Sequence, residues 1–518
     1  MNTEPNSLID LLRRSAHSFP ERMALVEGDG RRISYREMWQ SVVQLADQLH
    51  ALGISSGHRV AVLGEKSIET VCTFFAVMKV GAAYLPLDPA APVNRNRQLL
   101  LDGAVRAVVL AADFYESLVN RDELADFSCH DVTTGWVVLV FAASNQAAQS
   151  VQVEPGLVDP AYILFTSGSS GRPKGVVVSH RAVLSFLGWC SKTFNPSHED
   201  RFSSFAPLHF AMSVFDLFLA IKHGARLVLL GVTFLRHPTA LIRLLATERV
   251  SIWYSTPSGL RLLMGSTALS ERPLPDMKKI LFAGEPFPIE DLKRLRKLLP
   301  EPDFYNLYGA TEVNVCVCQP IPKIIPDERD RPFPLGKPCS HIQVRVVTEA
   351  GREAEIGEPG ELWIQGKAVM SGYLQDAGGV DRKNQVLADG EGGAWHQTAD
   401  IVAWTSNGAL NFIGRRDRVI KRQGYRISLL EIETALLSHV LIAEAAAIAR
   451  PESPQGFRIV LFVKFRGEDR LSSLALKIFL SSLLPVYMIP DQFIIMDLPK
   501  TSTGKIDFPT LARYAETL

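Results

Sequence analysis

The 518-residue sequence lacks the features that place a chain in a membrane or on a nucleic acid. It contains no run of about 18 consecutive apolar residues, as a membrane-spanning helix needs. Its first seven residues are polar and do not form the basic and then apolar pattern of a signal peptide. Lys plus Arg and Asp plus Glu both number 55, so no excess of charge would attract a polyanion. We therefore expect a cytoplasmic protein that binds neither nucleic acid nor membrane.

Cysteine is also scarce, with six in the whole chain. The six are scattered without the spacing of metal ligands, which favours reduced thiols. Cys316 and Cys318 are close in sequence, but they lie in an apolar run with strand periodicity. We interpret them as core residues.

The chain is long enough for two or three domains, because one core seldom exceeds about 300 residues. Strand and helix patterns alternate over the first 300 residues, as in layered α/β sheets. Examples are a buried strand over 59–63 and a helix over 68–78 with Ser67 as its N-cap. Residues 128–156 have weak periodicity, and we expect them to be irregular. The last hundred residues predict a small α/β domain.

The stretch from Tyr162 to His180 reads YILFTSGSSGRPKGVVVSH, a strand, a loop and a second strand. Its glycines allow backbone N–H groups to turn inward, its hydroxyl side chains add donors, and Lys174 adds positive charge. The pattern predicts a phosphate-binding loop. It is not a Walker A loop, because Lys174 is followed by glycine and a strand rather than by Ser or Thr and a helix. A solvated Gly/Ser hairpin is the alternative.

At these residues the sequence resembles the adenylate-forming superfamily, which includes acyl- and aryl-CoA synthetases and luciferases. The loop is most similar to that of nonribosomal peptide synthetase adenylation domains. Further motifs follow in the family's order: Asn306 to Glu312 (NLYGATE), Asp400 in QTAD, Gly414 to Ile427 (GRRDRVIKRQGYRI) and Pro499 to Asp507 (PKTSTGKID). One departure is Ala399, where the family has glycine before the aspartate.

The resemblance implies a fold and a division into domains. The fold class is α/β, with a large N-terminal domain of layered α/β subdomains and a β-barrel-like part, over residues 1–416. A small mobile C-terminal α/β domain, 417–518, would act as a lid and would pivot at Asp417. Residues 360–374 also match a family motif, which we interpret as structural.

The resemblance also implies that the chain is an AMP-forming ligase that uses ATP and Mg²⁺. The catalytic residues would be Lys505, Glu312, Thr166 and Lys174, with Glu312 as the Mg²⁺ ligand. Tyr308 would stack on adenine, Asp400 would bind the ribose, and Arg415 would contact the nucleotide. The complete set implied for ATP is Thr166, Ser167, Gly168, Ser169, Ser170, Gly171, Lys174, Gly284, Glu285, Asn306, Tyr308, Gly309, Thr311, Asp400, Arg415, Lys421 and Lys505.

The acid that would be activated is a small carboxylic acid. In relatives specific for α-amino acids, an aspartate pairs with the α-ammonium, but Ala211 stands in that place here. A buried ammonium without an anionic partner is strongly disfavoured. The other acid-site positions align with Met212, Phe215, Ser258, Leu281, Ala283, Leu307, Val315 and Cys316.

Asp216 is the one carboxylate nearby, and two interpretations of it stay open. It could be a capping-box partner for Ser213, which we expect to be the N-cap of a helix. Alternatively, Asp216 could bind the amine of a β-amino acid such as 3-aminobutyrate, as in the free-standing β-amino-acid adenylating enzymes that the pattern resembles. Leu217 would then suit a short side chain.

The sequence also leaves a choice between substrates and between acceptors. Leu281, Ala283, Leu307, Val315 and Cys316 resemble the pocket of prolyl adenylating enzymes, which favours proline or an amine-free ring acid such as pyrrole-2-carboxylate. The acceptor we expect is a phosphopantetheinylated acyl or peptidyl carrier protein, because the loop and hinge motifs are those of synthetase domains. We expect it to act in trans, since the sequence contains no condensation-domain or carrier motif. A CoA ligase and a non-catalytic ATP-binding homologue are the remaining hypotheses.

Overall fold

The structure is a computed structural model that describes residues 4–119, 127–133, 135–141, 155–167, 171–271, 274–375, 380–381, 385–386, 394–452, 456–500 and 506–518. By their contacts the residues form two compact units. The first contains Met1–Pro89, Leu100–Leu164 and Gly175–Gly414, and the second contains Ala90–Leu99, Phe165–Lys174 and Arg415–Leu518. The mixed α/β fold class is confirmed. The prediction that residues 417–518 move as a lid stays a prediction.

The first unit contains a nine-stranded sheet whose middle strands are parallel. The strands β12, β13 and β14, which carry or precede predicted acid-site residues, are neighbours, and β15 pairs antiparallel with β14. In spatial order the strands are β16 (Lys337–Pro338), β15 (Val317–Ile321), β14 (Asp303–Tyr308), β13 (Lys279–Phe282), β12 (Ile252–Ser255), β10 (Arg201–Ser204), β11 (Arg226–Leu229), β1 (Met23–Glu27) and β2 (Arg32–Ser34).

A second nine-stranded sheet contains the two strands that flank the phosphate loop, β8 and β9, as neighbours. In spatial order its strands are β20 (Val380–Asp381), β19 (Gly372–Leu374), β9 (Lys174–Ser179), β8 (Pro160–Thr166), β4 (Ala83–Pro86), β3 (Arg59–Leu63), β5 (Ala107–Ala111), β7 (Trp136–Phe141) and β6 (Phe127–Thr133).

The expectation of irregular structure over 128–156 was wrong for its first part. β6 and β7 pair antiparallel and extend the second sheet at its edge. β7 is an apolar run that is mostly buried. The exposed polar side chains of β6 weaken the periodicity there, which is typical of an edge strand. Residues 142–154 lie outside the described residues.

The first unit also contains a smaller third sheet. It lies in the part of the chain for which the resemblance implies a β-barrel-like region. It has five strands: β17 (Gln343–Val347), β18 (Gly360–Gln365), β22 (Trp395–Trp404), β21 (Gln385–Val386) and β23 (Leu410–Arg415). β22 is its ten-residue strand and carries Asp400.

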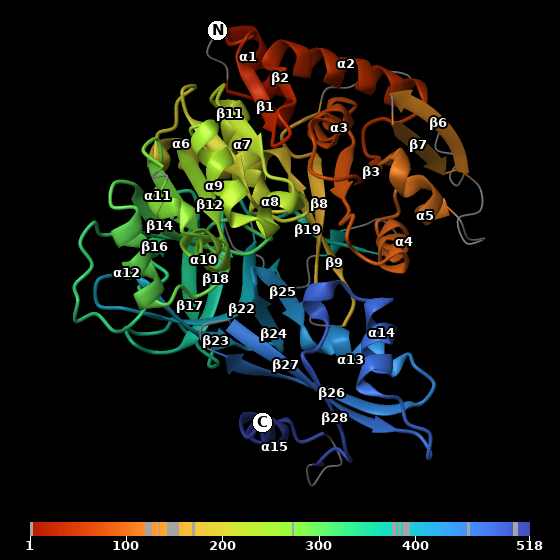
Figure 1. Ribbon diagram of the computed structural model, residues 1–518, viewed down its shortest axis with the longest axis vertical. Coiled ribbons are helices and arrows are strands. Elements are labelled where there is room, and N and C mark those ends of the chain that lie inside the picture. The colour runs from red at the N-terminus through yellow and green to blue at the C-terminus, as the bar shows by residue number, and fades with distance from the viewer. Residues whose placement is uncertain are drawn as a thin grey trace. The chain divides into compact units, whose positions relative to one another are not determined.

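Helices cover and join the two large sheets (Figure 1). α3 contacts β1 of the first sheet and also β3 and β4 of the second. The helices of the first unit are α1 (Leu8–Ser18), α2 (Tyr35–Ala51), α3 (Ile68–Lys79), α5 (Tyr115–Val119), α6 (His180–Phe194), α7 (Ser213–Lys222), α8 (Val232–Arg236), α9 (Pro238–Thr247), α10 (Pro257–Met264), α11 (Ala268–Glu271) and α12 (Ile289–Leu298), with a 3₁₀ turn η1 (Ala112–Phe114). Most of α4 (Val93–Asp102) belongs to the second unit. No helix among the described residues is long and apolar enough to cross a membrane.

Side-chain caps begin several of these helices where the sequence predicts them. Ser67 accepts a hydrogen bond from the Thr70 N–H at 3.2 Å and begins α3, as expected. Ser179 accepts one from the Ala182 N–H at 3.3 Å and begins α6. A capping serine typically stabilises a helix by about 1 kcal/mol.

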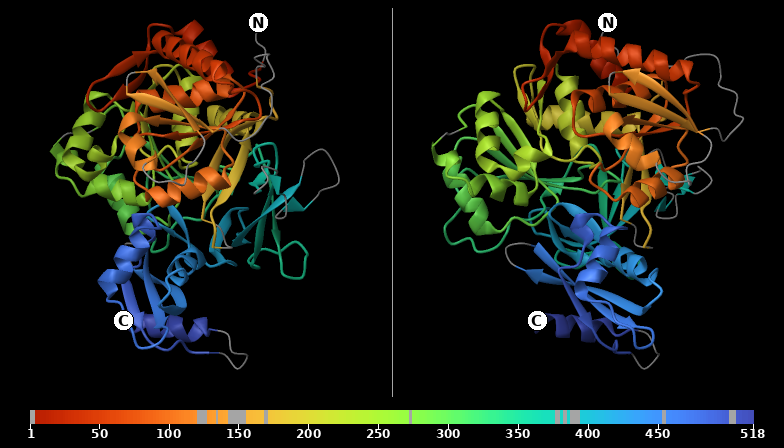
Figure 2. Two further views of the ribbon diagram at one scale, coloured as in Figure 1. Left: turned by 90° about the vertical axis from the view of Figure 1, so that its right-hand side faces the viewer. Right: turned by 45° about the vertical axis from the view of Figure 1, so that its right-hand side comes forward.

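The C-terminal unit is built on a three-stranded sheet with helices on both faces (Figure 2). Alternate residues of β26 and β27 pack against α13 and α14 on one face, and the intervening residues pack against α15 on the other. Its elements are β24 (Val419–Arg422), β25 (Tyr425–Ser428), α13 (Leu429–Leu437), β26 (Ile442–Glu452), β27 (Gly456–Phe465), α14 (Ser473–Ser481), η2 (Val486–Met488), β28 (Gln492–Ile495) and α15 (Phe508–Glu516).

Candidate active site

Tyr308 and Asp400, which the sequence assigns to the base and the ribose, lie in direct contact. Tyr308 is the last residue of β14, and its hydroxyl donates a hydrogen bond to the Asp400 carboxylate. Both are buried, Tyr308 at 7% and Asp400 at 1% exposure. The two motifs are 92 residues apart in sequence. The fold therefore joins a flat aromatic face and a hydroxyl-binding carboxylate in one place.

The turn before Asp400 explains why alanine at 399 is an unusual choice. Ala399 has φ +62°, in the left-handed region that glycine adopts without strain. Its N–H donates to the Glu361 carboxylate at 2.9 Å, and the Asp400 N–H donates to the Thr398 hydroxyl at 3.1 Å. These bonds hold the turn in the geometry that glycine would otherwise permit.

Glu312, the predicted Mg²⁺ ligand, is 2% exposed. The Tyr373 hydroxyl donates to Glu312 Oε1 at 2.8 Å, and the Glu312 carbonyl accepts from the Met370 N–H at 2.8 Å. Tyr373 belongs to β19, in the motif that we interpreted as structural from sequence. It orients the carboxylate, so that interpretation was incomplete.

The donor set fits Mg²⁺ that is shared with a nucleotide. Among the described residues, no group of three or more His, Cys, Asp or Glu side chains could form a metal cage. Mg²⁺ usually binds one or two protein carboxylates and takes its other ligands from phosphate and water. Glu312 alone therefore suffices for such an ion.

Glycines shape the loops near these residues. At Gly309 a Cβ would lie 1.8 Å from the Asn314 carbonyl oxygen, so no side chain fits there. Gly284, just after β13, has φ +91°. Asn306 lies within β14 and its side-chain amide donates to the Pro334 carbonyl at 3.3 Å, while Thr311 is partly buried in the loop that follows.

Glu285, predicted to serve the nucleotide, is hydrogen-bonded to a predicted acid-site residue. Its Oε2 accepts from the Ser258 hydroxyl at 2.7 Å and from the Ser258 N–H at 3.0 Å. Arg261 also donates to the Ser258 hydroxyl at 3.1 Å. These bonds fix the start of α10 against the end of β13.

Part of the phosphate loop is described. Ser167 is 6% exposed and its hydroxyl donates to the Arg426 carbonyl, whereas Thr166 and Lys174 are partly buried at the ends of β8 and β9. Gly171 has φ +79°, and a Cβ there would lie 2.6 Å from Thr434 Oγ1. Gly168, Ser169, Ser170 and the predicted catalytic Lys505 lie outside the described residues, so their roles stay predictions.

The charged motif after β23 contains a bidentate ion pair. Arg415 donates to both carboxylate oxygens of Asp417, at 2.6 Å from Nε and 2.9 Å from Nη2. This is the strong parallel geometry of an arginine with a carboxylate. Lys421 is partly buried in β24, opposite Arg426 of β25.

The predicted acid-site residues belong to one hydrophobic core. Leu281 and Ala283 lie at the end of β13, Leu307 lies on β14, and Val315 and Cys316 precede β15. The Cys316 N–H donates to the Tyr308 carbonyl at 2.8 Å, which joins Cys316 to the residue that we predict to stack on the base. The members of the core from this set are Phe215, Leu217, Leu281, Ala283, Leu307, Val315 and Cys316, and Ala211 and Met212 are partly buried against it.

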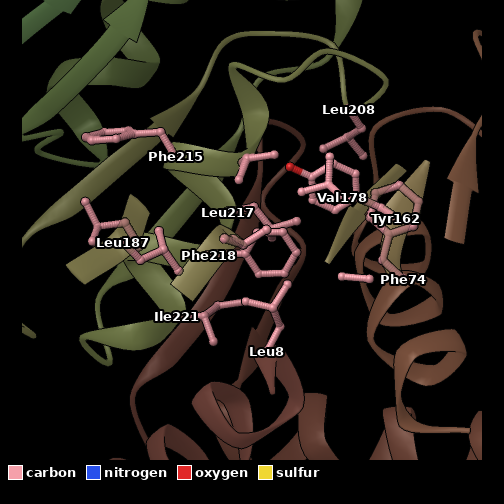
Figure 3. Packing of buried hydrophobic residues seen from close by; sticks show 14 of the residues in the cluster. Leu8, Phe74, Tyr162, Val178, Leu187, Leu208, Phe215, Leu217, Phe218 and Ile221 are labelled. Atoms are coloured by element: carbon pink, nitrogen blue, oxygen red, sulfur yellow. The ribbon is translucent and has the colours of Figure 1, made fainter. Parts of the chain in front are cut away.

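Phe215 and Leu217 lie on different faces of α7. The Phe215 ring contacts the ring of Tyr254 of β12 at 5.1 Å between centroids. Figure 3 shows Phe215 apart from Leu217, as expected for helical residues two positions apart.

Asp216 lies in the first turn of α7 and is fully buried, at 0% exposure. Neither of its carboxylate oxygens has a hydrogen-bond partner among the described residues. Burial raises the pKa of Asp216 well above its ordinary value, and the nearby Lys66 ammonium lowers it only in part. A buried carboxylate without partners is strongly disfavoured unless a cation or a donor joins it.

The expectation that Ser213 is an N-cap was wrong, and with it the capping-box interpretation of Asp216. Ser213 is the first helical residue, after Met212, and its hydroxyl donates to the carbonyls of Leu208 and Phe210 at 3.2 and 2.7 Å. Ser213 therefore lies within the helix, and its hydroxyl bonds to the preceding turn. Asp216 makes no bond back to Ser213.

Lys66 was missed from sequence. It lies between β3 and α3, and its ammonium donates to the carbonyls of Ser204 and Phe205 at 2.7 and 3.0 Å. Its place in the short loop after the buried parallel strand β3 was the available signal, because ligands bind at the carboxyl ends of such strands.

Comparison with known proteins gives matches over nearly the whole chain. The family described as AMP-binding enzyme matches residues 12–374, and its C-terminal domain family matches residues 431–505. An L-proline--[L-prolyl-carrier protein] ligase of Streptomyces coelicolor is 34% identical over 99% of this chain and 97% of its own length. The ligase of the same description from Pseudomonas fluorescens is 32% identical over 98% and 99%.

Among solved structures, the Vibrio cholerae adenylation domain AlmE, in complex with glycyl-adenosine-5'-phosphate, has the same fold. It superposes with a TM-score of 0.81 at 21% identity and covers 100% of this chain and 99% of its own.

Proposed function

The chain belongs to the family of AMP-binding enzymes, and from this premise we propose that it adenylates a short β-amino acid of the 3-aminobutyrate kind. We further propose that it transfers the acyl group to the phosphopantetheine thiol of a carrier protein in natural-product biosynthesis. The general reaction, without reference to a particular acid or acceptor, is that of an ATP-dependent, AMP-forming ligase.

In the first half-reaction a carboxylate oxygen attacks the α-phosphorus of ATP, and pyrophosphate leaves. Both reactants are anions, so catalysis depends on positioning and on positive charge near the reacting phosphorus. Tyr308 and Asp400 hold the nucleoside, and the loop around Thr166 and Lys174 orients the phosphates. Lys505 bridges the carboxylate and the phosphate.

Glu312 would hold Mg²⁺, and Tyr373 would fix the orientation of its carboxylate. When bound, the ion screens the negative charge of the phosphates. Tyr373 is partly buried, and its hydroxyl contacts Oε1 of the Glu312 carboxylate.

In the second half-reaction the thiol attacks the mixed anhydride and AMP leaves. Lys505 must first withdraw from the adenylate to admit the thiol. We propose that a rotation at Asp417 achieves this, because Asp417 matches the hinge position of the family motif and the chain passes from one compact unit to the other nearby, at Gly414–Arg415. Such domain rotations separate the two steps in time.

The observation that supports an amine-bearing acid is Asp216 with its two unpartnered, buried carboxylate oxygens. An ammonium group of the substrate would complete this site. At the position where relatives specific for α-amino acids have an aspartate that binds the α-ammonium, this chain has the uncharged Ala211. The amine is therefore expected one carbon further from the carboxylate, as in a β-amino acid.

Proline is the second candidate, and the two prolyl-carrier protein ligases favour it. The descriptions of these two relatives as carrier-protein ligases also support a carrier protein, rather than CoA, as the acceptor of the acyl group. Proline carries an ammonium that could meet Asp216, whereas pyrrole-2-carboxylate does not. A buried unpartnered carboxylate thus disfavours the amine-free ring acid.

The test is carboxylate-dependent exchange of labelled pyrophosphate into ATP. The panel contains 3-aminobutyrate, L-proline, pyrrole-2-carboxylate and butyrate, which is 3-aminobutyrate without its amine. We expect exchange with 3-aminobutyrate that is much faster than with butyrate. Faster exchange with proline would establish the second candidate, and no exchange with any acid would favour a non-catalytic homologue.

The Asp216→Asn variant tests the role of the carboxylate without a change of shape. Removing one member of a buried charge pair costs about 3–5 kcal/mol. We expect kcat/KM for 3-aminobutyrate to fall by about 100-fold or more, whereas that for butyrate should not fall. Asp113→Asn, at an exposed aspartate, is the matched control. Unchanged activation of 3-aminobutyrate by Asp216→Asn would remove the proposed ammonium partner.

A further inference from the structure

Two tyrosines flank the predicted acid-site residue Leu281 in the first nine-stranded sheet. In the parallel register, Tyr254 of β12 pairs with Leu281 of β13, and Leu281 pairs with Tyr305 of β14. Paired residues of neighbouring strands point to the same face of a sheet. The three side chains therefore form one row across this face, with Leu281 in the middle.

The burial of these strands shows which face this is. Tyr254 and Leu281 are buried in the hydrophobic core that contains the predicted acid-site residues, and Tyr305 packs against that core. The adjacent residues Trp253 and Phe282 belong to a different core, as expected for side chains on the opposite face. Tyr254 thus shares its face with the acid-site residues, although no sequence motif assigned it to the site.

The row lies deeper in the sheet than the other acid-site residues of β13 and β14. Ala283 and Leu307 lie two residues further along the chain than Leu281 and its neighbour in β14, toward the carboxyl ends of these strands. Two residues of a parallel strand span about 6–7 Å. Ligands reach such a sheet from the carboxyl ends of its strands. A side chain of the acid that passes Ala283 and Leu307 therefore reaches the row with Leu281 next.

Aromatic rings surround this row. The Tyr254 ring contacts the Phe215 ring of α7 at 5.1 Å between centroids and 69° between planes. Phe215 contacts Phe194 of α6 at 5.7 Å and 79°, and Phe194 contacts Tyr305 at 5.1 Å and 81°. Edge-to-face pairs of this kind are a favoured geometry. We name Tyr254, Phe215, Phe194 and Tyr305 the aromatic floor.

Tyr254 joins the sheet to α7 within the aromatic floor. α7 carries Asp216, the proposed partner of the substrate amine, directly after Phe215. Burial raises the pKa of Tyr254 well above its ordinary value, and the charge of Asp216 raises it further, as expected for a phenol near this carboxylate. Tyr254 therefore borders the part of the acid site where the amine is proposed to bind.

A packed floor of this kind limits the length of the bound acid. Protein interiors contain few voids larger than a water molecule, so each further methylene of a ligand must displace a neighbouring atom. Phe215 and Tyr254 are 1% and 3% exposed, and displacing either ring would break its contact with the other. The space beside Leu281 is therefore set by the ring of Tyr254.

We propose that Tyr254 is a specificity-determining residue of the acid site, whose ring closes the site beside Leu281 and restricts the activated acid to a short side chain. This inference rests on the proposed function and assigns the residue that sets the size of its substrate. Replacing the ring by a small side chain opens the site to longer homologues of the same acid.

The test measures how each variant ranks a short acid against its longer homologue by pyrophosphate exchange. The pairs are 3-aminobutyrate with 3-aminohexanoate, and L-proline with piperidine-2-carboxylate. In wild type we expect kcat/KM for the shorter acid to exceed that for the longer one by about 10-fold or more, because one methylene in a hydrophobic pocket changes it by about 10- to 200-fold. In Tyr254→Ala the ratio of longer to shorter acid should rise by about 10- to 100-fold.

Two further variants separate the ring from its hydroxyl and from the fold. Tyr254→Phe keeps the ring and should keep the preference for the shorter acid. Tyr254→Leu removes the ring but keeps an apolar side chain in the core, so it should shift the preference less than Tyr254→Ala and carries the test if that variant does not fold. Tyr514→Ala, at a tyrosine that is 45% exposed, is the matched control, and thermal unfolding of each variant checks folding.

A purely structural role for Tyr254 would lower kcat/KM for both acids of a pair by the same factor. A ratio within about twofold of wild type in the folded variants would overturn the inference and leave a measured activation of 3-aminobutyrate untouched. Exchange by wild type with proline but not with 3-aminobutyrate would remove the proposed substrate, and the proline pair would then decide the role of Tyr254. Absence of exchange with all four acids would overturn both proposals.

Discussion

The hydroxyl of Tyr373 is expected to control how well the enzyme uses Mg²⁺. Tyr373→Phe removes one atom, which donates to Glu312 Oε1 at 2.8 Å. The ring stays, with its edge contact to His396, and so do the backbone pairs between β19 and β9. The variant therefore tests the orientation of a single carboxylate.

The magnitude follows from the burial of Glu312, which is 2% exposed. A hydrogen bond to a charged group contributes about 1.5–3 kcal/mol, and loss of a residue that orients a metal ligand lowers metal affinity about 10- to 100-fold. We expect the Mg²⁺ concentration for half-maximal exchange to rise by about the same factor. At saturating Mg²⁺ most of the wild-type rate should return.

The assay is pyrophosphate exchange at saturating ATP and acid, with Mg²⁺ as the variable. Glu312→Gln is the positive control and should lose more activity than Tyr373→Phe. Tyr514→Phe, at a tyrosine that is 45% exposed, is the matched negative control. A half-saturating Mg²⁺ concentration within about twofold of wild type in Tyr373→Phe would refute the reasoning.

Two further variants test the turn beside Asp400 and the division of labour between the half-reactions. The φ of +62° costs alanine about 1–2 kcal/mol, and the greater freedom of glycine in the unfolded chain offsets about 0.4–1 kcal/mol of this. Ala399→Gly should therefore raise the free energy of unfolding in urea by roughly 0.5–1 kcal/mol, and a decrease would contradict the strain. Lys505→Ala should abolish pyrophosphate exchange but spare thioester formation from a supplied acyl adenylate, and equal loss of both would contradict its assignment to the first step.

Motifs with their own chemistry could be located from sequence, because each carries its functional groups within a few residues. The strands β8 and β9 and the loop between them were predicted from local pattern. Tyr308, Glu312 and Asp400 were assigned from motifs, and the fold brings Tyr308 and Asp400 into contact. The sequence also showed that alanine replaces the family's glycine at position 399, but it did not show that Ala399 has a left-handed backbone conformation.

Interactions between distant segments could not be predicted in this way. Lys66 bonds to a carbonyl 138 residues away, and no local pattern records that partner. Tyr373 contacts Glu312 across 61 residues. The N-cap prediction at Ser213 was wrong for a different reason. A serine hydroxyl at a helix start can accept a hydrogen bond from a helix N–H or donate one to a carbonyl of the preceding turn. The neighbouring residues in the sequence do not determine which of the two forms, and here the hydroxyl donates.

The bridge from Lys66 to the end of β10 has a consequence for engineering by segment exchange. A graft of residues 200–320 from another adenylating enzyme would replace β10 together with β12, β13 and β14, which carry or precede predicted acid-site residues, and would leave position 66 to the host. The graft would then bring its own residues 204 and 205 into a host that supplies residue 66. Such a chimera keeps the hydrogen bonds between residue 66 and the carbonyls of residues 204 and 205 only if the host has lysine at position 66, so both segments must be exchanged together to preserve this contact.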